Sequence, residues 1–269
     1  MGSAELEPGV RYEMPPSFGP SRAPDVEADF DVHGSTVEFE SSEDALAPLL
    51  PRWFRPTPHP IVSFGYRHMR GMRWMGGRDY QILRVGISVM CEATGETAPN
   101  NFGLVLWESD CAPILAGREL MGAPKLFGTI PVIEVSGEAH AFECREYEAR
   151  LLRARAFDLQ PLSAAEVAAK RAQQEQSWVY YWKYIPGVGS TAEPDANYPV
   201  AIKLHTPFTR MWKGRGELEL AEPSPAEAPY SHRILQRLAA LPRRSEVRSS
   251  AWHAAGCALY RNQTRRLDR

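Results

Sequence analysis

The chain has 269 residues and a formal net charge of −2, with 43% hydrophobic and 24% charged residues. This is the balance of a globular protein long enough to bury a water-poor interior. The charge offers no general attraction to nucleic acid or to an anionic membrane, so neither is expected as a partner. No apolar run approaches the ~20 residues of a membrane span, and the N-terminus lacks the basic start and apolar stretch of a secretory signal. We therefore expect a cytoplasmic protein.

Residues 1–28 are rich in proline, glycine and acidic side chains and have no apolar period. They predict an arm without a core of its own, poorly ordered or packed against a neighbouring subunit. Residues 29–269 are predicted to form one domain, because no repeat or long linker divides them. A strand over Phe30–Phe39 follows the arm, and Ser42 then caps a short helix that ends before Pro51.

Short β-type runs separated by turn residues dominate the rest of the chain: Ile61–Tyr66, Ile82–Cys91, Phe102–Trp107, Gly128–Val135, His140–Glu146, Glu148–Phe157, Val200–Thr206 and Gly216–Leu220. Helices are predicted over Ala164–Gln176, after the N-cap Ser163, and over Tyr230–Ala239. The elements do not alternate as βαβ units. The pattern therefore predicts a mainly β (α+β) fold, in which an antiparallel sheet forms a closed β-barrel or double-sheet core with a few flanking helices.

Two composition features of the C-terminal half of the sequence call for an interpretation. The run Trp178–Tyr184 places alternate aromatic side chains on one face of a strand. This is typical of a barrel wall or a subunit interface, and it would also suit the lining of a substrate cavity. The arginines at 243–248 and 261–266 are interpreted as solvated.

Lysine is rare in this chain. Of the 31 basic residues all but five are arginines, and the lysines are Lys125, Lys170, Lys183, Lys203 and Lys213. Arginine cannot deprotonate in a protein, whereas a desolvated lysine can become a neutral nucleophile. Lys125 ends the run Gly-Arg-Glu-Leu-Met-Gly-Ala-Pro-Lys that begins at Gly117. In this run glycine and alanine allow close approach and proline fixes the backbone. Taken locally, a surface turn with a solvated lysine remains an alternative to a nucleophile.

Other catalytic signatures are missing from the sequence. The seven histidines contain no pair at metal-ligand spacing, and the four cysteines are too widely spaced for a metal or redox pair. We therefore predict no metal, no cofactor, and free thiols.

The run Gly-Arg-Glu-Leu-x-x-x-Pro-Lys at 117–125 resembles the signature of the acetoacetate decarboxylase family, in which this lysine forms a Schiff base with a keto acid. Two later segments, 182–186 (Trp-Lys-Tyr-Ile-Pro) and 212–220, are also similar to family segments, and the order matches from about residue 30 to 260. The resemblance implies the family's fold and a homo-oligomer. It implies that Lys125 is the catalytic lysine and that Glu119 belongs to the same catalytic motif. We further expect Tyr80 to be a catalytic proton donor and four residues to bind substrate: Arg118, Arg78, Arg84 and Met121.

The chain departs from the decarboxylase at two positions. Leu126 stands where the decarboxylase has a second lysine, and Ile82 stands where a glutamate faces the catalytic lysine. The resemblance therefore implies an imine-forming lyase that acts on a small keto acid or ketone, with decarboxylation of a β-keto acid as the default reaction. A divergent aldolase or dehydratase that uses the same lysine is one alternative. A non-catalytic ligand-binding protein on the same barrel is the other.

Overall fold

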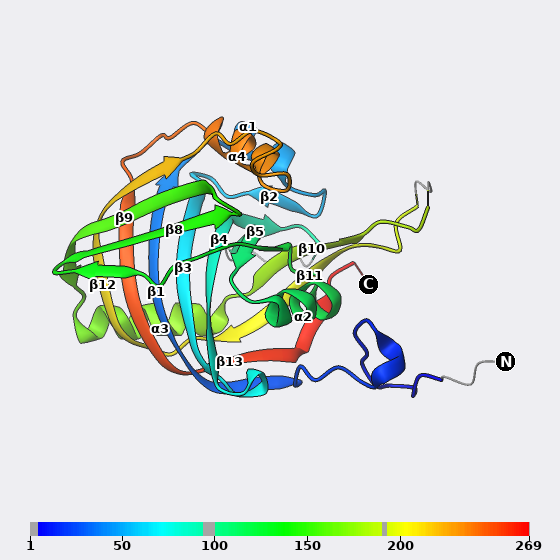
Figure 1. The fold of residues 1–269 in the computed structure, drawn as a ribbon. Coiled ribbons are helices and arrows are strands. Elements are labelled where there is room, and N and C mark those ends of the chain that lie inside the picture. Colours follow the sequence, from blue (N-terminus) through cyan, green and yellow to red (C-terminus); the bar gives the residue numbers. More distant parts are fainter. Residues whose placement is uncertain (1–4, 94–99, 190–192, 269) are drawn as a thin grey trace.

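Long curved strands make up most of the structure, as Figure 1 shows. The computed structural model describes residues 5–93, 100–189 and 193–268. Its strands are β1 (Val26–Glu40), β2 (Phe54–Pro56), β3 (Ile61–Met72), β4 (Arg78–Cys91), β5 (Asn100–Glu108), β6 (Lys125–Phe127), β7 (Glu134–Ser136), β8 (Ala139–Glu146), β9 (Ala149–Pro161), β10 (Val179–Ile185), β11 (Ala196–His205), β12 (Phe208–Leu220) and β13 (Arg248–Arg266). The α-helices are α1 (Glu43–Leu46), α2 (Cys111–Met121), α3 (Ala164–Gln176) and α4 (His232–Ala239).

The strands β1, β3, β4, β5, β10, β11 and β13 close into a ring, because β13 pairs back onto β1. Closure removes the unpaired edges that an open sheet would present. The strands β12, β9, β8 and β7 continue the sheet outward from β13. The predicted mainly β fold with few helices is confirmed. The sheet is mixed, however, because β5 pairs in parallel with β10 and β6.

Each long strand buries side chains on both of its faces. On β4, Leu83, Val85 and Ile87 belong to one apolar cluster, which also contains Trp107 and is called the Trp107 core below. Tyr80 and Ile82 belong to a second cluster with Met121 and Trp252, called the Trp252 core. Because neighbouring side chains on a strand point to opposite faces, the two cores lie on opposite sides of the sheet.

The caps predicted for two helices are present in the structure. The Ser42 hydroxyl accepts a hydrogen bond from the Ala45 amide at the start of α1. Ser163 and Glu166 form a reciprocal capping box at the start of α3, whose bounds match the prediction. Helix α4 begins at His232 instead of Tyr230. In the described part of the chain, no helix is both long and apolar enough to span a membrane.

The structure differs from the sequence-based expectations in four respects. The predicted strand over Gly128–Val135 reduces to an isolated bridge at Thr129 and the short β7, because Pro131 cannot donate to a sheet ladder. Helix α2 was missed, since Pro113 and Gly117 weaken its helix propensity. The 19-residue strand β13 was also missed, and Arg261, expected to be solvated, is buried.

The chain before β1 lies largely outside the sheet. It contains one short 3-10 turn at Pro16–Phe18, and the Met14 amide donates to the Glu119 carboxylate over 2.9 Å. The placement of this arm against a neighbouring subunit, and the division at residue 28, stay predictions.

Candidate active site

The position of Lys125 is fixed by the helix that precedes it. Asp110 caps α2, and Gly122 ends it in the left-handed conformation with φ +67°. The Ala123 amide then donates back to the Gly117 carbonyl, and the Pro124 carbonyl accepts from the Leu106 amide, both over 3.0 Å. These bonds direct the chain into β6, so Lys125 is its first residue and pairs with Leu106 on β5.

The Lys125 side chain is buried, with 8% of its surface exposed. Its Nζ lies 2.9 Å from Oε1 of Glu108 and donates to the Pro113 carbonyl over 2.8 Å. The aliphatic part lies across Gly117, where a Cβ would come within 2.4 Å of Cδ and Cε. The first glycine of the motif therefore provides the space that the lysine occupies.

Glu108 is the site residue that sequence reasoning missed. Its carboxylate is fully buried, and Oε2 has no hydrogen-bond partner in the described residues. Burial is the largest influence on its pKa and raises it, while the Lys125 charge acts in the opposite direction. Glu108 stands directly opposite Ile82 on the neighbouring strand. A carboxylate thus faces the lysine from β5, although β4 carries isoleucine at the position expected for it.

Strand register places the site residues in two adjacent rows on one face. Arg67, Ile82 and Glu108 form one row across β3, β4 and β5. Arg84, Leu106 and Lys125 form the next row across β4, β5 and β6. Residues two apart on a strand share a face, so both rows point to the side of the Trp252 core.

Two arginines bring positive charge to this face. Arg84 is 7% exposed, and its Nε and Nη2 have no hydrogen-bond partner in the part of the chain described. Its guanidinium lies against Gly86 and Gly103, where a Cβ would approach it within 2.6 and 3.3 Å. Burial, followed by the charge of Arg84, lowers the pKa of Arg67. The buried Arg84 guanidinium, with two nitrogens that lack a described partner, suits an anion, because unpaired buried donors are costly.

Tyr80 lies on the same face and is 5% exposed. Burial, followed by the charge of Glu108, raises the pKa of Tyr80 well above its ordinary value, against the opposing charges of Arg261 and Arg67. Its hydroxyl therefore keeps its proton at neutral pH and can act only as a weak acid or a hydrogen-bond donor.

The other predicted site residues lie in different surroundings. Met121 is buried in the Trp252 core. Arg118 is exposed and its Nη1 donates to the Lys125 carbonyl over 2.8 Å, so it holds the backbone. Arg78 is exposed and donates to the Met75 carbonyl, while the Glu119 carboxylate accepts from Met14. Among the described contacts, neither Arg78 nor Glu119 pairs with the Lys125 amine.

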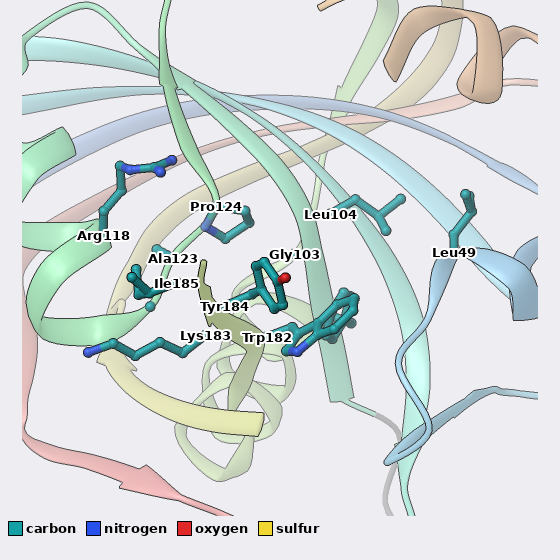
Figure 2. Close-up of a pocket in the computed structure, with 12 residues that line it drawn as sticks. Leu49, Gly103, Leu104, Arg118, Ala123, Pro124, Trp182, Lys183, Tyr184 and Ile185 are labelled. Atoms are coloured by element: carbon teal, nitrogen blue, oxygen red, sulfur yellow. The ribbon is translucent and has the colours of Figure 1, made fainter. Parts of the chain in front are cut away.

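A groove of about 270 Å³ lies against the segment Gly122–Pro124, which connects α2 to β6 (Figure 2). Arg118, Ala123, Pro124 and Lys183 line it together with Trp182 and Tyr184 of the aromatic strand. Trp182 and Tyr184 are 40% and 49% exposed, whereas Tyr180 is fully buried in the Trp107 core. Gly122, Ala123 and Pro124 line the groove, whereas Lys125 and Glu108 are not among its lining residues.

The fold and the sequence of this chain are similar to those of known proteins. A sequence comparison with curated proteins gives no match. Among solved structures, the enduracididine biosynthesis enzyme MppR is similar with a TM-score of 0.68, 17% identity and 98% of both chains covered. A structure of acetoacetate decarboxylase gives 0.71 at 19% identity, over 94% of this chain and 93% of that one.

The acetoacetate decarboxylase from Legionella pneumophila gives a TM-score of 0.64 at 20% identity, over 87% and 86% of the two chains. At these identities the structural likeness concerns the fold. The family model for acetoacetate decarboxylase matches residues 13–254, which include the motif Gly117–Lys125 and both rows of site residues. The chain therefore belongs to the acetoacetate decarboxylase family.

Proposed function

We propose that this protein is a lyase that forms a Schiff base between Lys125 and a small keto acid. The observation that carries the proposal is the buried pair of Lys125 and Glu108, 2.9 Å apart. A lysine nucleophile needs an acceptor for its ammonium proton and exclusion of water, and this pair provides both. Glu108 would supply the carboxylate that the family motif has at the position of Ile82.

The proposed reaction begins when Glu108 takes a proton from the Lys125 ammonium and the neutral amine attacks the keto carbon. Glu108 returns that proton to the carbinolamine oxygen, which leaves as water and produces a protonated imine. The imine nitrogen accepts the electron pair released when the bond to carbon dioxide breaks. A proton is then added to the enamine carbon, and water hydrolyses the imine to release the ketone. Tyr80 is proposed as a donor in these proton transfers, because its hydroxyl remains protonated.

The substrate carboxylate is proposed to bind Arg84, whose Nε and Nη2 have no partner within the described residues. Arg67 adds a second positive charge on the same face. Two guanidinium groups can hold a carboxylate with paired, charge-assisted hydrogen bonds. A keto acid would thus be oriented with its carbonyl toward Lys125.

The same two arginines favour a second candidate, an aldolase or dehydratase. Carbon dioxide is neutral, so an ion-paired carboxylate must give up this stabilisation when it leaves. Interactions that stabilise the ground state in this way slow decarboxylation and favour removal of a proton beside the imine. A structure of MppR, which has a similar fold, is complexed with the condensation product of pyruvate and imidazole 4-carboxaldehyde, and this complex supports the second candidate.

Borohydride trapping tests the proposal. The protein is incubated with acetoacetate or pyruvate, reduced with borohydride, and analysed by intact mass and peptide mapping. We expect one adduct on Lys125, no adduct in Lys125→Ala, and an unchanged adduct in Lys170→Ala. Lys170 is a matched control because it lies exposed on α3.

Gas release distinguishes the two candidates. An adduct with carbon dioxide release supports decarboxylation, and an adduct without it supports the aldolase or dehydratase. If no member of a panel of keto acids leaves an adduct on Lys125, the protein is not an imine enzyme and the binding-protein alternative gains support.

A further inference from the structure

A second groove lies on the side of the sheet opposite to Lys125. It has a volume of about 450 Å³, and its polar lining includes His33, His140 and His253. Trp252 points into the Trp252 core, so the next residue on β13, His253, faces the other side. Leu159, Pro161 and Trp212 supply apolar walls. A groove of this size and composition is of the kind that binds small ligands in proteins.

Two of the groove histidines, His33 and His253, belong to a continuous row of basic side chains. Strand register places His68, His33, His253 and Arg210 opposite one another across β3, β1, β13 and β12. The rings of His33 and His253 are stacked with centroids 4.0 Å apart, and Trp212 meets His253 edge-on at 5.2 Å. Flat rings therefore form one wall of the groove.

The charges around the row are mainly positive. Burial, followed by the charges of His33, Arg210, His140 and Arg70, lowers the pKa of His253 to about 4. Burial, followed by the charges of Arg70, His68 and Arg210, lowers the pKa of His33, while the charge of Asp31 acts in the opposite direction. The nearby carboxylates are Asp31, Asp79 and Glu138. Asp31 acts on His33, Asp79 pairs with His68 at 3.2 Å, and Glu138 lines the groove.

From this geometry we infer that the second groove binds a small aromatic carboxylate. The flat ring of the ligand packs against Trp212, Leu159 and Pro161, and its carboxylate accepts hydrogen bonds from His33 and His253. Cations next to neutral imidazoles leave a positive potential that a carboxylate neutralises. A metal is the poorer occupant, because no cluster of three or more ligating side chains in the described residues has metal-site geometry.

Binding of the carboxylate is coupled to proton uptake. The bound negative charge favours the imidazolium form, so the pKa values of His33 and His253 rise in the complex. Affinity consequently increases as the pH falls from 7 to 5, by up to about tenfold per pH unit for each proton taken up. A neutral ligand of the same shape shows no such increase.

The test uses 2-naphthoate as the probe and 2-naphthalenemethanol as its neutral isostere. Titrations of protein carrying isotope-labelled histidine are followed by NMR at pH 7, 6 and 5. We expect naphthoate to shift the resonances of His33, His140 and His253, and to leave the distant His59 and His232 unchanged. The Lys125→Ala variant is expected to bind equally well, which separates this groove from the imine site.

Three variants complete the design. His253→Gln is expected to weaken naphthoate at least tenfold and to remove most of the pH dependence, while Trp212→Leu weakens both naphthoate and the alcohol. Arg153→Gln, on β9 outside the groove, is the control and should change nothing. Equal affinity for the alcohol and naphthoate, or naphthoate shifts confined to histidines outside the groove, would overturn the inference. Unaltered binding in a folded His253→Gln protein would do the same.

Discussion

An ammonium and a carboxylate that lie 2.9 Å apart and are both shielded from water depend on each other. Removing one partner of a buried pair leaves an uncompensated charge, at a cost of about 3–5 kcal/mol. Protonation offers the alternative, because a proton passed from Lys125 to Glu108 leaves two neutral groups. The raised pKa of Glu108 moves the carboxyl toward that state. The pair is therefore suited to moving protons as well as to holding charge.

The first prediction concerns Glu108→Gln. This change keeps the shape of the side chain but removes the proton acceptor, so the rate of imine formation should fall about 10²–10⁴-fold. Stopped-flow measurements of imine formation at pH 7 check the rate. Glu217→Gln is a matched control, because this exposed carboxylate lies on β12 and makes no described contact with Lys125. A Glu108→Gln protein with unaltered rates would exclude Glu108 from the mechanism.

The second prediction concerns Gly117→Ala. The new methyl group would lie 2.4 Å from Cδ and Cε of Lys125, so the amine must move. We expect at least a tenfold slower imine formation, since tenfold corresponds to about 1.4 kcal/mol in the barrier. Leu115→Ala is the control on the same helix, where the side chain is 45% exposed. An unchanged rate of imine formation in Gly117→Ala would show that the Lys125 side chain can accommodate the methyl group without loss of function.

The third prediction concerns the stacked histidines and pH. The folded-state pKa of His253 is about 4, below its ordinary 6.5, so unfolded chains bind this proton more readily. The stability contributed by neutral His253 is present above pH 6.5 and is lost as the pH falls toward 4. Urea unfolding should show a falling midpoint over this range. His253→Gln should flatten the decline by about 1 kcal/mol, a figure reduced for solvent screening. An identical decline in His253→Gln would contradict the assignment.

At the scale of elements, short-range signals predicted the capped helices and most strands, but long-range pairing decided the site. Ser163 and Glu166 predict the start of α3, because the residues of a capping box lie only three positions apart in the sequence. Glu108 could not be placed beside Lys125 from the sequence, because their proximity depends on the parallel pairing of β5 with β6. The sequence signal that could have indicated Glu108 is its place at the end of the apolar run Phe102–Trp107. The lysine motif, by contrast, could be recognised from the sequence, since Gly117–Lys125 is contiguous; the role of Lys125 stays a prediction.

The fourth prediction tests the start of α3. Ser163→Ala removes both hydroxyl contacts of the capping box and should lower the free energy of unfolding by about 1 kcal/mol. Thermal unfolding followed by circular dichroism measures the loss. Ser177→Ala at the other end of the helix removes a single bond to the Gln174 carbonyl and should cost less. Equal losses in both variants would argue against the capping box as the main stabilising contact.

At the scale of the whole molecule, the arm before β1 exposes apolar side chains that a monomer leaves in water. Met14 is 74% exposed and Phe18 is 89% exposed. Apolar side chains on an extended arm favour contact with another surface. We therefore propose that the arm packs on a neighbouring copy in a homo-oligomer.

The fifth prediction follows from this proposal. Light scattering coupled to size exclusion should give a mass that is a multiple of the 30.2 kDa chain. The double change Met14→Ser and Phe18→Ser should shift the equilibrium toward the monomer. Val188→Ser is the control, an exposed apolar residue far along the chain from the arm. A monomer at all concentrations would refute the proposal.

The closure of the ring by β1 and β13 has a consequence for biosynthesis. Eleven residues of β1 pair with β13, and Trp252 packs where Gly34 leaves no side chain. The two partners stand near opposite ends of the sequence, so the ring cannot close on the ribosome until Arg248–Arg266 has emerged. Folding of such distant contacts is slow, and partly made sheets expose unpaired strands meanwhile. A nascent chain thus carries Lys125 long before the strands that bury its side chain have all paired.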